Sequence, residues 1–332
     1  VRNKKKDTTS VNFSLKNFII YKAINYYPNL TILSDNNEFY NRVMIREALT
    51  VGLVPLTNND LFSLFDINLK NNDTFSIIKP KEDKISFLID LFIDQLSYFI
   101  DKDVDIIIFP EMYLIDEIKK NIKEIIRSSL KTDLRTTNTT IIMCGTIWKN
   151  KTNICHVYDN FGNLIYEQNK YTPFLYCNKL EDLVPTNHDI NFLDIFGVGR
   201  IFTLICKDIM NQDLKQIITE LNGDVILNSA YSPSLDVISY SESFSTSNNT
   251  ISIFSNACAS INGSSVIGYC AIPRRLDNKS STYTKKYKCN KKLKVCDNNC
   301  IPFILSIPYN NIKMNSAGTM NCEINIKRLK YK

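Results

Sequence analysis

The order of apolar and polar residues along the chain changes repeatedly between strand-like and helix-like patterns. A continuous β-branched run at 104–112 is typical of a strand that is buried on both faces, and further strands are predicted at 200–206 and 224–230. Apolar residues at helical spacing over 81–100 and 115–130 predict amphipathic helices. The regular succession of such strands and helices predicts a layered α/β protein.

A predicted hairpin interrupts this succession. Residues 153–170 contain two strand-like segments joined by "NFGN" at 160–163, a sequence typical of a turn. Further strands are predicted at 48–56 and 139–148, and a further helix at 211–222. Because antiparallel pairs accompany the helices, we expect mixed layers rather than a purely parallel, doubly wound sheet.

The length and composition suit one large domain with an appendage. The chain has 332 residues, of which 44% are hydrophobic and 11% aromatic, enough for a sizeable core. Residues 1–45 are predicted to be an N-terminal helical extension, or a linker from a larger protein, since the chain begins with Val1 rather than Met. Residues 46–332 form the main domain, and its segment from about 276 to 332 is rich in Cys and Lys.

The charge pattern limits the partners that we expect. The net charge of +6 is concentrated at 1–6, 285–294 and 327–332, and we interpret these clusters as solvated surface and tails, so nucleic acid is not indicated as a partner. No apolar run is long enough to cross a bilayer and no signal peptide is visible, which predicts a cytoplasmic protein. In that compartment the ten cysteines are expected to be thiols rather than disulfides.

Three chemically distinct side chains follow predicted strands, where α/β folds collect functional groups. Taken singly, Glu111 is a loop acid, Lys170 a surface lysine and Cys206 a buried structural thiol. Taken together, they supply a base, a cation for an oxyanion and a nucleophile. Neither His156 nor His188 is placed to be a partner of the cysteine, so a Cys–His protease arrangement is disfavoured.

At these positions the sequence resembles the nitrilase, or carbon–nitrogen hydrolase, superfamily. Five blocks match in order over about residues 46–275: "DIIIFPEMYL", "VYDNFGNLIYEQNKYTPF", "RIFTLICKDIM", "GDVILNSAYSP" and "SNACASINGSSVIGYCAIP". The resemblance implies a four-layer α-β-β-α sandwich of the nitrilase type. It also implies an amidase-like enzyme that cleaves the C–N bond of a small-molecule amide through a thioester, without a cofactor or metal, and that forms a dimer or larger homo-oligomer.

The resemblance also assigns roles to individual residues. Glu111 would be the general base, Lys170 the oxyanion stabiliser and Cys206 the nucleophile. A second family glutamate corresponds to Glu181, which is alternatively a solvated loop acid beside Asp182.

The cysteine motif departs from the family pattern. Lys207 replaces the aromatic residue that usually follows the cysteine in amidases, whereas Asp208 is retained. True nitrilases carry Trp-Glu at these two positions, so cleavage of nitriles is disfavoured. Lys207 would either lower the pKa of the thiol or point away and cover the surface.

Two alternatives stay open at this level. The chain is alternatively a nitrilase-like module of a larger multidomain protein, for example covalently linked to a reverse transcriptase in prokaryotic antiviral defence, with an assembly or accessory role. Cys289, Cys296 and Cys300 fit a zinc site loosely, but no fourth ligand is evident nearby, and unligated thiols are the preferred interpretation.

Overall fold

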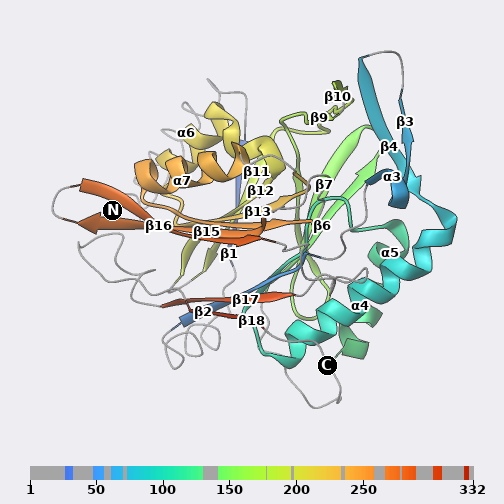
Figure 1. Ribbon diagram of the computed structural model, residues 1–332, viewed down its shortest axis with the longest axis horizontal. Helices are drawn as coiled ribbons and strands as arrows, with labels where there is room; N and C mark the ends of the chain where they lie inside the picture. The colour runs from blue at the N-terminus through green and yellow to red at the C-terminus, as the bar shows by residue number, and fades with distance from the viewer. Residues whose placement is uncertain are drawn as a thin grey trace, which may run out of the picture.

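The computed structural model describes the chain at residues 27–32, 48–55, 61–69, 73–129, 141–176, 178–195, 198–232, 236–257, 266–276, 279–288, 302–308 and 325–328. In these ranges the chain forms two seven-stranded sheets and one four-stranded sheet. The two large sheets lie face to face in the centre of the molecule (Figure 1).

The first large sheet consists mostly of strands from the second half of the chain. Its order is β1 (Tyr27–Ile32), β11 (Asp189–Ile195), β12 (Gly199–Ile205), β13 (Val225–Ala230), β14 (Ile251–Asn256), β15 (Val266–Leu276) and β16 (Lys279–Lys288). Strands β12, β13 and β14 run parallel, so their carboxyl ends lie at one edge of the sheet.

The second large sheet contains the first-half strands and two from the end of the chain. Its order is β18 (Asn325–Arg328), β17 (Phe303–Pro308), β2 (Ala48–Leu53), β5 (Ile106–Ile108), β6 (Ile141–Lys149), β7 (Thr152–Tyr158) and β8 (Leu164–Asn169). Strands β2, β5 and β6 run parallel, whereas β7 and β8 form the predicted antiparallel hairpin.

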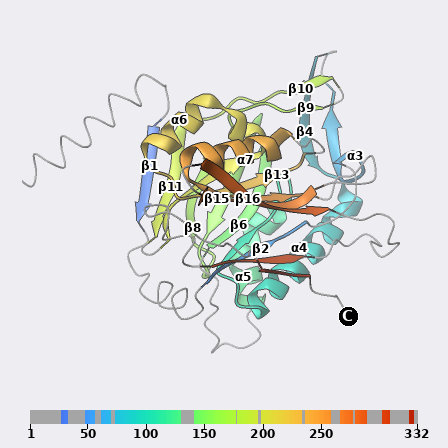
Figure 2. The same ribbon diagram turned by 60° about the vertical axis from the view of Figure 1, so that its left-hand side comes forward.

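Helices cover the outer face of each large sheet, as Figures 1 and 2 show. They are α6 (Gln212–Glu220) and α7 (Asp236–Asn248) on the first sheet, and α4 (Ile85–Asp101) and α5 (Asp116–Ser129) on the second. The predicted α-β-β-α order of layers is therefore confirmed. Among the residues that the structure describes, no helix has both the length and the apolarity that a membrane crossing requires.

The alternating faces of the strands explain the two-sided packing. Ile106 and Ile108 of β5 point inward and pack in one cluster with side chains of the first sheet, such as Phe202. Ile107, between them, points outward into the cluster formed with α4 and α5. Since successive side chains of a strand face opposite sides, a continuous apolar run fills both layers at once.

A small third sheet projects from one side of the sandwich (Figure 1). Its order is β3 (Phe65–Asn68), β4 (Thr74–Pro80), β10 (Lys179–Glu181) and β9 (Leu175–Tyr176), and it follows the one-turn helix α3 (Leu61–Leu64). The sequence gives these segments a loop-like, polar character, but strand β10 pairs with β4 more than a hundred residues earlier. Such a long-range pairing has no local sequence signal.

Two further segments differ from the sequence-based expectation. Residues 27–32, assigned to a helical extension, instead form strand β1, which pairs in parallel with β11 and satisfies the backbone groups of that neighbour. Residues 236–248, for which the sequence analysis predicts no helix, form helix α7. Five of its residues are buried because the helix packs on β14 and β15.

Hydrogen bonds join the two large sheets where their parallel strands end. The Ser229 hydroxyl, near the end of β13, donates to the Phe109 carbonyl oxygen over 2.8 Å, and Ser255, near the end of β14, donates to the Ile108 carbonyl oxygen over 3.0 Å. All four residues belong to the buried interior. These bonds fix the edges of the two sheets against each other, and the segment after β5 begins at this seam.

A bulge in β6 gives this segment its path. The register of β6 against β7 shifts between Met143 and Thr146, and Gly145 within the bulge has a φ of 76°. Thr146 then accepts a hydrogen bond from the Met112 amide at its hydroxyl oxygen (2.8 Å) and one from the Leu114 amide at its carbonyl oxygen (3.1 Å). The bulge therefore holds the backbone immediately after Glu111.

Gly145→Ala tests whether the bulge in β6 supports the backbone that follows Glu111. A Cβ atom at this position would lie 2.2 Å from the Pro110 carbonyl oxygen, and the positive φ is itself unfavourable for alanine. We expect the substitution to lower the free energy of unfolding by about 2–4 kcal/mol in urea denaturation. Lys120→Ala, at an exposed position of α5, is the control and should change stability little. Equal stability of the two variants would contradict the proposed role of the bulge.

Candidate active site

Glu111 lies in the seam between the two large sheets. It follows β5 by three residues, and its side chain is 1% exposed. Its backbone amide donates to the Ala230 carbonyl oxygen (3.4 Å), and its Oε2 accepts a hydrogen bond from the Tyr231 amide (3.1 Å). The carboxylate is thus held by the chain that follows β13, which comes from the opposite sheet.

Lys170 directly follows β8 and is as deeply buried as Glu111. Its Nζ donates to Glu111 Oε1 and to Glu181 Oε2, each over 2.7 Å. Glu181 ends strand β10 of the small sheet and is 2% exposed. Glu181 is therefore buried, unlike a solvated loop acid. A buried carboxylate requires a cation or several hydrogen-bond donors, and Lys170 is the cation here.

Asn153 links all three of these residues, and sequence reasoning missed it. Its Nδ2 donates to Glu111 Oε1 (2.8 Å) and to Glu181 Oε1 (3.2 Å), and its carbonyl oxygen accepts a hydrogen bond from the Lys170 amide (2.8 Å). It is fully buried at the start of β7. A polar amide among apolar strand residues, directly across the hairpin from Lys170, is the signal that could have identified it.

Cys206 occupies a strained turn at the end of β12. Its φ of 51° lies in the left-handed region, and the short helix η2 (Cys206–Met210) begins at this residue. The Asn211 side chain then caps α6 by accepting bonds from the Asp213 and Leu214 amides. A positive φ at a non-glycine residue is unfavourable, and such strain concentrates at functional sites.

One group of the neighbouring strand β13 and one that directly follows this strand hold the cysteine. The Asn228 side chain donates to the Cys206 carbonyl oxygen over 3.1 Å, and the Tyr231 amide donates to the thiol sulfur as well as to Glu111. Burial raises the pKa of the Cys206 thiol well above its ordinary value, and Glu111 raises it further, whereas Lys170 opposes the rise. The resting site therefore holds a neutral thiol close to a carboxylate and an ammonium.

The charge of Lys170 is secured by its neighbours. Burial by itself would lower the pKa of Lys170, but Glu111 and Glu181 outweigh this effect and hold that pKa well above its ordinary value. Burial also raises the pKa of Glu181, against the attraction of Lys170, and the adjacent Glu111 carboxylate adds to the rise. Two carboxylates thus share one permanent cation.

Asp208 connects the cysteine turn with the loop after Lys170. Its Oδ1 accepts hydrogen bonds from the Tyr171 amide (3.0 Å) and from the Thr172 amide (2.8 Å). Its Oδ2 is buried without a hydrogen-bond partner among the described residues. Burial raises the pKa of Asp208 to about 7, although Lys170 and the two amides oppose the rise.

Lys207, His156 and three C-terminal cysteines are the other residues that the sequence analysis singles out. Lys207 places its ammonium 5.5 Å from the centre of the Phe174 ring. His156 is buried in β7, and burial lowers the pKa of its imidazole to about 3, so it is neutral. Cys289, Cys296 and Cys300 lie outside the described residues; within the described ranges no group of three or more His, Cys, Asp and Glu side chains is arranged to hold a metal ion.

Comparison with known proteins shows a similarity of fold. No protein-family model and no curated protein matches the sequence. An amidase from Nesterenkonia sp. AN1, with the acetamide moiety of fluoroacetamide covalently added at its active-site cysteine, superposes with a TM-score of 0.50. It is 11% identical, and the match covers 73% of this chain and 92% of that protein.

Two further solved structures give lower scores. Nit3 from Saccharomyces cerevisiae, a member of the nitrilase superfamily, is 13% identical with a TM-score of 0.46, and the match covers 80% of this chain and 92% of that protein. Glutamine-dependent NAD+ synthetase from Acinetobacter baumannii is 13% identical with a TM-score of 0.47, over 86% of this chain. The match covers 48% of the synthetase, so the chain spans about half the length of that protein.

At these identities the similarity concerns the fold alone. The Nesterenkonia amidase is a nitrilase-superfamily protein. The chain described here therefore has the nitrilase-type fold, as the sequence motifs predict.

Asp208→Asn tests the buried carboxyl group. The pKa of Asp208 is about 7 in the folded protein and about 4 in the unfolded chain. Between these two pH values only the unfolded chain has lost the Asp208 proton, so the folded state loses stability as the pH rises through this interval. Asparagine cannot ionise, but its Oδ1 can still accept both amide bonds. We expect the stability of the native protein, relative to Asp208→Asn, to fall by a few kcal/mol across this interval in urea denaturation.

Asp90→Asn, on the exposed face of α4, is the matched control. Its stability should follow that of the native protein at every pH between 4 and 8. Parallel pH curves for the native protein and Asp208→Asn would show that Asp208 titrates normally, contrary to this prediction.

Proposed function

We propose that the chain is an amidase-like hydrolase of non-peptide C–N bonds, in which Cys206 attacks the carbonyl carbon of a small-molecule amide. The observation that carries the proposal is the buried Lys170 ammonium, bound at 2.7 Å by both Glu111 and Glu181 beside the thiol. A purely structural cysteine needs no such neighbours. Burying three ionisable side chains costs several kcal/mol per ion before compensation, which favours a functional reason for them.

In the first half of the proposed reaction, Glu111 acts as the general base. The neutral thiol gives its proton to the carboxylate while the sulfur attacks the carbonyl carbon. The Tyr231 amide, which donates to both partners, supports their alignment. The carbonyl oxygen becomes an oxyanion, which Lys170 stabilises because its raised pKa keeps it charged throughout. Glu111 then protonates the departing amine, and a thioester remains on Cys206.

In the second half, water replaces the amine. Glu111, again ionised, removes a proton from the water as the oxygen attacks the thioester carbon, and Lys170 again stabilises the oxyanion. Collapse of this intermediate breaks the C–S bond, releases the carboxylic acid and returns the proton to the thiol. The neutral resting thiol favours this scheme over a preformed thiolate, since burial and Glu111 both raise the pKa of Cys206.

Glu181 and Asn153 are proposed to position the reacting groups. Both hold atoms of the Glu111–Lys170 pair and neither is in contact with bulk solvent. Glu181 also accepts a hydrogen bond from the Phe174 amide (2.9 Å), so it ties the small sheet to the loop after Lys170. Removing Glu181 would leave Lys170 with one carboxylate and greater freedom to move.

The experiment uses two kinds of substrate. The first is p-nitrophenyl acetate, whose activated acyl group forms a thioester with a reactive cysteine, and the second is a panel of short primary amides. Mass spectrometry should locate the acetyl group on Cys206, and ammonia release should identify an amide that turns over. Cys206→Ala should abolish both. Glu111→Gln and Lys170→Met should each lower kcat/KM by about 100-fold or more, through loss of the base and of the oxyanion partner.

Cys270→Ala is the matched control, because Cys270 is a buried strand thiol whose pKa is raised by burial alone. This variant should acylate and turn over like the native protein. Turnover that survives Cys206→Ala, or an acetyl group found on another cysteine, would refute the proposal.

A further inference from the structure

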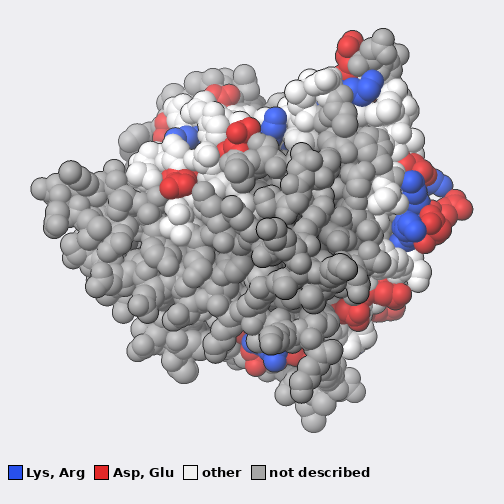
Figure 3. All heavy atoms as spheres, viewed as in Figure 1, with Lys and Arg blue, Asp and Glu red and all other residues white. Residues whose placement is uncertain are grey.

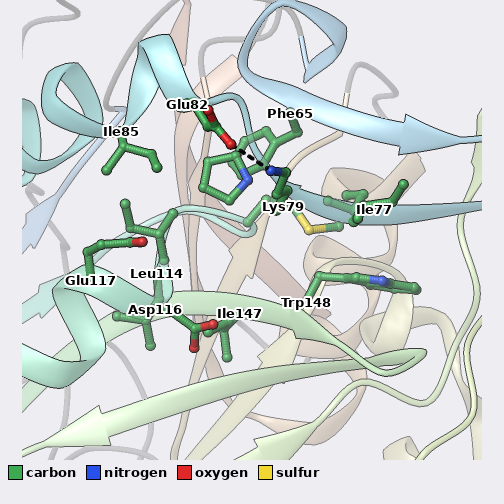
Figure 4. A pocket seen from close by; sticks show the side chains of 14 residues that line it. Phe65, Ile77, Lys79, Glu82, Ile85, Leu114, Asp116, Glu117, Ile147 and Trp148 are labelled. Atoms are coloured by element: carbon green, nitrogen blue, oxygen red, sulfur yellow. Dashed lines mark hydrogen bonds and ion pairs between the residues drawn. The ribbon is translucent and has the colours of Figure 1, made fainter.

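A cavity lies between the small sheet and the helices of the second large sheet, with a volume of about 320 Å³ (Figure 4). That volume is within the range of small-molecule sites, ~300–1,000 Å³. Most of the lining side chains are apolar, among them Phe65, Ile77, Ile85, Leu114, Ile147 and Trp148. In Figure 4 Trp148 and Ile77 lie on one side of the cavity, and Ile85 and Glu117 on the other.

This cavity is separate from the candidate active site. Lys170, Glu181 and Cys206 are not among its lining residues. Met112 forms the partition, because it lines the cavity and also places its sulfur 3.9 Å from Asn153 Nδ2. A molecule in the cavity would therefore lie behind the Glu111 segment rather than against the thiol.

The ionisable side chains around the cavity are mainly acidic. Glu82, Asp116 and Glu117 line it, together with a single lysine, Lys79. Lys79 is bound to Glu82 over 3.1 Å at an exposed position, and their charges cancel. Asp116 forms a longer ion pair with Lys149, at 3.8 Å, whereas Glu117 has no ion-pair partner among the described residues. The cavity therefore has an excess of negative charge in a chain whose net charge is +6.

The exposed surface beside the cavity is different in character. At the right-hand edge of Figure 3, where η1 (Glu82–Lys84) and the start of α4 lie, acidic and basic side chains are interspersed. Lys84 and Asp83 form a second ion pair there, 2.9 Å long. The charges of this edge largely compensate one another, whereas the Glu117 carboxylate has no ion-pair partner among the described residues.

An aromatic ring and two carboxylates together favour a cation. An ammonium group over the face of a Trp ring is attracted by the ring quadrupole, and carboxylates add a direct charge attraction. The N-terminus of α5, which begins at Asp116, opposes a cation with about half a positive charge. The carboxylates of Asp116 and Glu117 lie at the same helix end and together outweigh this half charge, even with part of the Asp116 charge offset by Lys149.

We propose that this cavity binds a small organic ammonium ion with an aromatic or branched apolar body, whose ammonium group lies between Trp148 and the carboxylates of Asp116 and Glu117. The apolar body fills the space between Phe65, Ile77 and Ile85. The proposal does not depend on the hydrolase activity proposed above.

Trp148 provides the measurement, because it is the single tryptophan of the chain and its environment changes when the cavity fills. Titration with phenethylammonium should change the intrinsic tryptophan fluorescence along a saturable curve. The neutral analogue 2-phenylethanol should bind at least about tenfold more weakly, and the anion 3-phenylpropionate more weakly still, because only the ammonium gains from the carboxylates.

The double variant Asp116→Asn/Glu117→Gln should lower the affinity for phenethylammonium at least about tenfold. Circular dichroism and the urea midpoint check that this variant is folded. Glu124→Gln, on the exposed face of the same helix, removes a charge away from the cavity and should leave the affinity unchanged. Cys206→Ala should also bind normally, so that failure of the hydrolase proposal can be distinguished from failure of this one.

Three results would overturn the inference. One is a fluorescence signal that stays flat up to about 10 mM phenethylammonium. Another is equal affinity for the ammonium ion and the alcohol. The third is unchanged affinity in the folded double variant.

Discussion

The centre of this structure depends on one buried cation. The Lys170 ammonium is 1% exposed and has lost its contact with bulk water, which costs several kcal/mol unless anions replace the water. Glu111 and Glu181 supply the replacement at 2.7 Å each, and they in turn need donors of their own. Asn153, the Tyr231 amide and the Phe174 amide meet that need.

This requirement connects elements that are remote in the sequence. Glu111 follows β5 of one large sheet, the Tyr231 amide follows β13 of the other, and Glu181 ends a strand of the small sheet. If any of these elements shifted, a charged group would be left buried without its partner, which is strongly destabilising. The bulge at Gly145 and the bonds across the seam therefore support the chemistry as well as the fold.

The same environment explains how a cysteine can be fully buried and still be placed to react with a base. Burial keeps the Cys206 thiol neutral, so it is protected until a base takes its proton. The left-handed turn at the end of β12 leaves Cys206 buried and close enough to Glu111 and Lys170 for their charges to act on the thiol. Lys207 departs from the usual sequence motif, and its ammonium lies over the Phe174 ring. The pKa of the thiol is set instead by burial, Glu111, Lys170 and Glu181, which other segments of the chain bring to Cys206.

Much of this arrangement was determined by the sequence alone, because its signals are local. Apolar periodicity located β5, β6, β12, β13 and helices α4 to α6, and the motifs around Glu111, Lys170 and Cys206 predicted the fold. Tertiary structure alone decided the small sheet, whose β4 and β10 pair across about a hundred residues, and with it the burial of Glu181. It also decided the bridging position of Asn153 and the raised pKa of Asp208. Burial and hydrogen bonding depend on which distant segments meet, and no local pattern of residues records that.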